Sequence, residues 1–248
     1  MNLRLIGSTT GAVLLASTLG ACGAAQQDPQ CMVGKGAFAT VYTLKPGQTP
    51  APACSFLNTL PPERVGLEKY FNEDPNGPDS VSLRSRQIGD ELAHKDTQID
   101  PDAPKQANAV GAFATEVPLE DKFCEVPVLT TAELQSRYGG VSKAPVSLRY
   151  EWSNLRIYST PQIPGTQFTA ELRYTKDGCT AEYSAKGIWP VVACGTNNKP
   201  DASKCDPNPD PAVGRVRGSG INPIFKVECH PVALICVLTT DVPSREEP

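Results

Sequence analysis

The chain has 248 residues, with 23 basic and 27 acidic side chains and a formal net charge of −4. This length suits one large domain or two small ones and is ample for a buried core. Charges of both signs are mixed along the chain, and the acidic balance argues against nucleic acid as a partner.

The N-terminus has the parts of a secretory signal. Arg4 supplies a basic start, and an apolar run from Leu5 to Leu19 follows it. This run is too short to span a bilayer as a permanent helix. An ordinary cleaved signal or a short apolar helix would give the same pattern up to this point.

The end of the signal narrows the interpretation. Leu19-Gly20-Ala21-Cys22 resembles the lipobox of bacterial lipoproteins, which is Leu, two small residues and Cys. The resemblance implies removal of residues 1–21 and attachment of acyl chains, such as palmitate, to Cys22, which holds the protein on a membrane without spanning it. In that family an Asp after the Cys favours inner-membrane retention. Gly23 stands there instead, so the resemblance favours the outer membrane.

Residues 22–30 are small and polar, and we expect them to form a short tether between the lipid and one disulfide-rich domain over 31–248. With Cys22 set aside for lipid, eight cysteines remain. An even number in an exported chain predicts four disulfides, whose pairing the sequence leaves open. A zinc site is the alternative, but paired Cys at two-to-four-residue spacing do not occur. The eight are Cys31, Cys54, Cys124, Cys179, Cys194, Cys205, Cys229 and Cys236.

In the N-terminal half, alternation from Phe38 to Leu44 predicts a strand. Residues 62–71 place Leu67, Tyr70 and Phe71 at helical spacing, so a helix is predicted there. A strand broken near Arg86 is expected over 81–88. A further strand is expected over 109–117. Thr130-Thr131-Ala132-Glu133 has the spacing of a capping box, which predicts a short helix through Tyr138.

The C-terminal half carries the clearest pattern. Apolar and polar residues alternate strictly over 146–153 and 168–174, which predicts two half-buried strands. A turn at 176–178 and a returning strand over 179–189 complete a hairpin. The last strands are expected over 224–229 and 232–242. The predicted fold is therefore mainly β: a disulfide-linked antiparallel sandwich or open barrel with one or two short helices.

A glycine-rich stretch and an acidic loop are the first candidates for chemistry. Gly34 to Tyr42 resembles the phosphate-binding loop of protein kinases, but Ala39 replaces the third glycine and the other kinase motifs are missing, so a glycine turn entering a strand is favoured. Asp206, Asn208 and Asp210 have the alternation of a calcium loop. Pro211 stands where that loop needs glycine, which favours a solvated loop without metal.

Catalytic signatures of hydrolases are missing as well. Gly140 to Ala144 lacks the last glycine of a nucleophile elbow, and only His94 and His230 could serve a Ser-His-Asp triad. Tyr150, Trp152 and Trp189 could line a ligand surface, although aromatics on alternating strands are more often core. We find no motif for a cofactor, a metal or a catalytic residue.

These observations predict a non-enzymatic lipoprotein, anchored by lipid to the outer membrane or cell surface, that binds another envelope component or has a structural role there. The first alternative is an accessory subunit that faces the periplasm and serves an envelope complex. The second is a secreted hydrolase whose site has no recognisable motif. The membrane, reached through the lipid, and another envelope protein or surface ligand are the expected partners.

Overall fold

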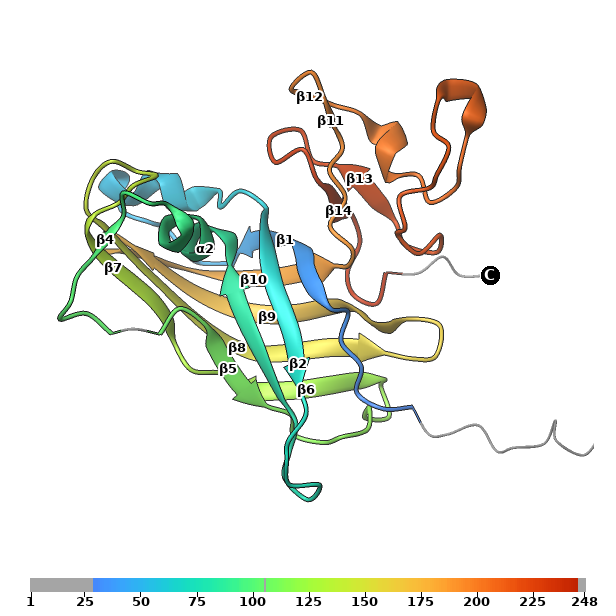
Figure 1. Cartoon of the computed structure of the whole chain (residues 1–248), viewed down its shortest axis with the longest axis horizontal. Coiled ribbons are helices and arrows are strands. Elements are labelled where there is room, and N and C mark those ends of the chain that lie inside the picture. Colours follow the sequence, from blue (N-terminus) through green and yellow to red (C-terminus); the bar gives the residue numbers. More distant parts are fainter. Residues whose placement is uncertain (1–28, 105, 245–248) are drawn as a thin grey trace, which may run out of the picture.

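The computed structural model describes residues 29–104 and 106–244 (Figure 1). Its main feature is an antiparallel sheet that curls into a half-barrel, which confirms the predicted mainly β, disulfide-linked class and corresponds to the open-barrel form of it. Its strands are β1 (Gly36–Leu44), β2 (Glu63–Tyr70), β3 (Ser80–Ser85), β4 (Gln98–Ile99), β5 (Ala109–Ala112), β6 (Phe123–Val128), β7 (Ala132–Tyr138), β8 (Val146–Ser159), β9 (Pro164–Lys176) and β10 (Cys179–Ile188).

Short elements complete the described chain. A helix and a 3-10 turn lie near one end of the curled sheet, and the segment after β10 forms a separate layer beyond it (Figure 1). These elements are η2 (Pro52–Asn58), α2 (Arg86–Ala93), β11 (Gly195–Thr196), β12 (Lys199–Pro200), η3 (Ala202–Cys205), η4 (Pro211–Val213), β13 (Val227–Cys229) and β14 (Cys236–Leu238). No helix of the described residues is long and apolar enough to cross a membrane.

The order of neighbours in the sheet is β4-β7-β8-β9-β10-β1-β2-β3-β5. Strand β8 is 14 residues long, so its first half pairs with β7 and its second half with β6, while β9 runs along its other side. Strand β5, at one end of this order, lies beside β6 and the residues between β6 and β7. The backbone N–H of Thr130 donates to Val110 O at 2.8 Å, and that of Ala114 donates to Glu125 O at 2.8 Å.

Gly111 permits this close approach of β5 to the end of β6. A Cβ at this position would lie 2.4 Å from the backbone oxygen of Val128, so only glycine lets the two segments approach so closely.

The barrel core consists of side chains that alternate inward from most strands of the sheet. The predicted strands over 146–153 and 168–174 and the hairpin with 179–189 are confirmed, because they lie within β8, β9 and β10. Tyr150 and Trp152 are 1% and 2% exposed, which confirms the interpretation of these aromatics as core. Other fully buried members include Phe38, Leu67, Leu83, Leu148, Ile157, Phe168, Leu172, Tyr174 and Tyr183.

Residues 190–244, which we call the C-terminal module, pack on the outer face of the sheet. Ala39 and Ile188 belong to the sheet but are buried in the module's own apolar cluster, together with Phe225 and Val237. Strand β14 contacts both β1 and β10. The module has little regular structure, since its four strands are only two or three residues long.

All eight cysteines of the described chain form disulfides, as the sequence predicts. Two of them, Cys31–Cys124 and Cys54–Cys179, close loops of 93 and 125 residues around the barrel. The other two, Cys194–Cys229 and Cys205–Cys236, close loops of 35 and 31 residues within the module. Three sulfurs of the module lie within 4.8 Å of one another because its two disulfides are adjacent. Disulfide sulfurs are not thiolates, so this group does not support the zinc alternative.

Two predicted helices are wrong. Residues 62–71 contain strand β2, in which Val65 and Leu67 point inward. The backbone of this strand pairs with β1 on one side and with β3 on the other. The capping-box segment is strand β7, with Ala132 and Leu134 buried. In both cases the pairing with neighbouring strands outweighs the helical spacing of the local sequence. A short helix is marginally stable on its own and would need a strong local preference to form instead.

The helix that does form lies where a broken strand was expected. The strand predicted over 81–88 ends at Ser85, whose side chain caps α2 by accepting a hydrogen bond from the Ile88 N–H at 3.2 Å. Ile88 and Glu91 are the buried residues of this helix. The strand predicted over 109–117 ends at Ala112, and the two last strands are shorter than predicted.

Candidate binding groove

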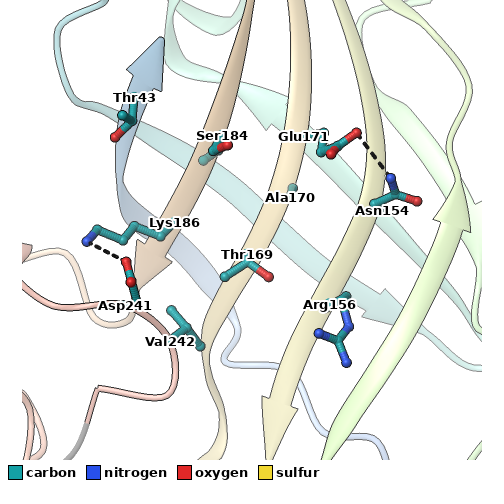
Figure 2. A pocket seen from close by; sticks show the side chains of 11 residues that line it. Thr43, Asn154, Arg156, Thr169, Ala170, Glu171, Ser184, Lys186, Asp241 and Val242 are labelled. Carbon is teal, nitrogen blue, oxygen red and sulfur yellow. Dashed lines mark hydrogen bonds and ion pairs between the residues drawn. The ribbon is translucent and has the colours of Figure 1, made fainter. Parts of the chain in front are cut away.

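A groove lies on the outer face of the sheet, across β1, β10, β9 and β8 (Figure 2). Its floor is made of small side chains because the strands place Thr43, Ser184 and Thr169 outward while the intervening residues point into the core. Thr43 pairs in register with Ser184, and Thr169 pairs with Lys186. The groove has a volume of about 430 Å³.

The end of the described chain forms one wall of the groove. Asp241 and Val242 rise beside Lys186, whose Nζ donates to Thr240 O at 2.8 Å and lies 3.6 Å from Asp241 Oδ1 (Figure 2). Buried Gln167 holds this segment in place: its Nε2 donates to Ser244 O, and its Oε1 accepts from Ser244 N, both at 2.8 Å.

The opposite wall comes from β8, which bulges between Ser153 and Arg156. Asn154 has a φ of 50°, in the left-handed region that Asn tolerates, and its Nδ2 donates to Glu171 Oε2 at 3.1 Å (Figure 2). Arg156 forms ion pairs with Asp121 and Glu125 of the neighbouring segment.

Each charge at the groove has an opposite partner close by. Lys186 faces Asp241, and Arg156 has two carboxylates. Glu171 lies 3.2 Å from Lys45 Nζ. The groove therefore offers hydroxyl, amide and paired ionic groups. Such a surface favours a polar, largely uncharged ligand segment over a highly charged one.

A second polar cluster lies at the end of the barrel that α2 covers. The Tyr42 hydroxyl donates to Glu63 Oε1 at 2.7 Å, and the backbone N–H of Gln87 donates to Glu63 Oε2 at 3.3 Å. The hydroxyls of Tyr150 and Tyr174 donate to Gln87 Oε1. A small pocket of about 170 Å³ opens beside these groups.

Burial raises the pKa of Glu63 to about 7, and the hydrogen bonds from Tyr42 and Gln87 lower it only in part. Burial, followed by the nearby Glu63 carboxyl, raises the pKa of Tyr42 and Tyr150, so both hydroxyls stay protonated. The cluster joins β1, β2, β8, β9 and α2. The sequence analysis did not identify this cluster because Glu63 lies in a segment that was predicted to be a helix. Had that segment been recognised as a strand, the carboxylate of Glu63 within it would have been the signal.

The possible hydrolase residues come close together without forming a catalytic pair. His94 packs against Gly140, at the start of the loop that carries Ser142. The Ser142 hydroxyl, however, donates to Ala144 O at 3.0 Å, while His94 Nδ1 accepts from the Asp96 N–H. His230 lies in the module, where its Nδ1 accepts from two backbone N–H groups of its own turn. Neither histidine lines the groove.

The remaining sequence candidates have structural roles. Asp206 pairs with Arg215 and accepts from the Asn208 N–H, and Asp210 caps η4, so the calcium-like spacing serves turns. Gly36, with a φ of 115°, begins β1, as the glycine-turn interpretation predicts. Trp189 Nε1 donates to Lys35 O. Cys22 lies outside the described residues.

Comparison with known proteins identifies the class. The family model described as MlpA matches residues 36–190, which covers most of the barrel. The chain therefore belongs to the MlpA family. It is also 29% identical, over 98% of its own length and 99% of the relative's, to a Myxococcus xanthus protein named "Putative lipoprotein MlpA". This relationship supports its classification as a lipoprotein. No solved structure matches the chain.

Proposed function

We propose that this lipoprotein is anchored in the outer membrane through acyl chains on Cys22, and that its folded part binds another envelope component without catalysing a reaction. The groove carries the proposal. It joins four strands of a rigid sheet to the C-terminal segment, and its charges are paired. An open surface of this kind, lined by hydroxyl, amide and ionic side chains, suits a protein or glycan partner better than a small substrate, which is normally enclosed.

The anchor can be tested separately from the groove. Cells that express the wild-type chain or C22A are fed labelled fatty acid and then fractionated. We expect label and membrane association only in the wild type, because one cysteine receives the lipid. A C22A chain that still takes up label and still sediments with outer membranes would disprove the assignment.

The groove is tested with substitutions that fill it. T169R and S184R place a long cation on its floor, whereas T180R places the same side chain on the outward face of β10 outside the groove. Partners captured by crosslinking in intact cells should fall at least about tenfold for the first two variants and remain for T180R. Equal capture by all three variants would remove the groove from the proposal.

The face of the membrane decides between a surface binder and a periplasmic accessory subunit. A membrane-impermeant amine label is applied to intact cells. Lys35, whose side chain is 84% exposed, serves as reporter, and Lys69, which is 10% exposed, is an internal control. Labelling of Lys35 in intact cells supports the surface protein. Labelling only after permeabilisation favours the accessory subunit.

A further inference from the structure

Three large apolar side chains are exposed near the point where the described chain begins. Phe71 is 78% exposed, Met32 is 49% exposed and Val117 is 45% exposed. They come from three different segments: the residue after β2, the segment before β1 and the loop between β5 and β6. We call these three residues the tether-side patch. Single exposed apolar residues are common, but a group of them often marks a contact surface.

Hydrogen bonds hold the three segments of the patch together. The Lys69 ammonium donates to Cys31 O at 2.9 Å and lies 5.0 Å from the centroid of the Phe71 ring. The backbone N–H of Cys31 donates to Glu116 O at 3.0 Å. Met32 and Val117 are the next residues after Cys31 and Glu116, so the three patch residues belong to segments that meet at one junction.

The junction is rigid. Lys69 also lies 2.7 Å from Asp79 Oδ2 and 3.6 Å from Glu116 Oε2. Cys31 is linked to β6 through its disulfide with Cys124. Burial alone would raise the pKa of Asp79, but the hydrogen bonds from Lys69 and Asn72 lower it overall, so the carboxylate stays charged. The patch is therefore a fixed part of the barrel.

We propose that the tether-side patch rests on the lipid surface in which the protein is anchored. The inference depends on the proposed lipid at Cys22. Nine residues separate Cys22 from Cys31, and such a segment spans at most about 30 Å when fully extended. The lipid surface therefore lies within about 30 Å of Cys31, at the junction where the patch residues meet. The membrane-binding strength of such surfaces grows with the apolar area that they bury.

Charge selects the kind of lipid. Glu73 and Asp74 lie two and three residues after Phe71, in the exposed β2–β3 turn at the bottom of Figure 1. Two exposed carboxylates in the turn that begins at Phe71 oppose contact with anionic headgroups. The patch therefore fits a zwitterionic lipid surface, with shallow insertion of Phe71.

The test measures the depth of single side chains in the full lipidated protein. F71W and V117W place a fluorescent reporter in the patch, and V232W places the same reporter at a 76% exposed position of the C-terminal module. Each variant is reconstituted in phosphatidylcholine vesicles with or without brominated acyl chains. Emission is corrected for the native Trp152 and Trp189 with the wild-type protein.

We expect the added emission of F71W and V117W to fall by about half with brominated lipid, because interfacial side chains reach the acyl boundary, while that of V232W is unchanged. Equal quenching at all three positions, or at none, in protein that still floats with the vesicles would overturn the docking and leave the anchor intact. Protein that does not float with the vesicles would overturn both.

Discussion

In the barrel, long strands pair over many residues and bury aromatic rings such as Phe168 and Tyr183 inside a curled sheet. In the C-terminal module, the strands are two or three residues long, and two disulfides lie at the centre of its apolar cluster. One chain therefore uses two means of stabilisation. Backbone ladders with apolar burial dominate in the barrel, and covalent cross-links compensate for sparse regular structure in the module.

The largest effect should come from removing both module disulfides, by changing Cys194, Cys229, Cys205 and Cys236 to Ala. Loops of 35 and 31 residues contribute about 7 kcal/mol together in the chain-entropy model. We expect proteases to cut within 190–244 while β8 to β10 stay protected. The comparison variant is C31A/C124A, which removes one barrel disulfide and should leave residues 190–244 resistant to protease because both module disulfides remain. Simultaneous cleavage of module and barrel in the quadruple variant would show that the two regions unfold together.

Truncation of a barrel residue should destabilise the whole sheet. Phe168 is fully buried, its ring centroid lies 5.4 Å from that of Phe38, and it fills the space above Gly187. F168A should therefore lower the free energy of unfolding by about 3–5 kcal/mol. Urea unfolding measures this, with F56A, at a 49% exposed position, as the control. A loss below 1 kcal/mol would mean that the barrel is loosely packed.

The Glu63 cluster should make barrel stability depend on pH. The pKa of Glu63 is about 7 in the folded chain against 4.5 for the free side chain. Between these values the folded state binds more protons, so stability falls as the pH rises and the loss is complete above about pH 7. It amounts to at most about 3 kcal/mol. The difference in unfolding free energy between wild type and E63Q should therefore change from pH 5 to pH 8; a constant difference contradicts the buried acid.

The smallest effect concerns the contact between the regions. Q167A leaves the backbone N–H and O of Ser244 without their partner, at a cost of about 1–3 kcal/mol. It should release the wall that contains Asp241 and speed up amide exchange in 239–244. Q162A, at an exposed position of the preceding loop, is the control. Unchanged exchange in Q167A would mean that other contacts fix this segment.

The sequence predicted the strands that carry strict alternation, because one face of β8, β9 and β10 is buried and the period of two survives in the residues. It failed at β2 and β7. In the β2 segment, Leu67, Tyr70 and Phe71 repeat at helical spacing, although Phe71 lies outside the strand and is exposed. In both segments, pairing with strands that are distant in the chain determines the secondary structure. The spacing of residues within the segment does not reveal these partners.

The disulfides were predictable in number but not in pairing, since eight cysteines allow 105 connectivities. The groove was not predictable at all. Thr43, Ser184 and Thr169 are ordinary outward residues of three strands, and only the register places them side by side. The wall that contains Asp241 is held in place by hydrogen bonds between Gln167 and Ser244. These two residues are 77 positions apart in the chain.

The contact of β5 with the β6 region near Gly111 also bears on behaviour at high concentration. Lipoproteins confined to a membrane surface encounter copies of themselves often, and unpaired strand edges invite sheet-to-sheet polymerisation. Here the N–H of Thr130 and of Ala114 already find acceptors across the seam. Because the chain satisfies these donors itself, this seam offers fewer unpaired backbone groups to which a strand of a second copy could add.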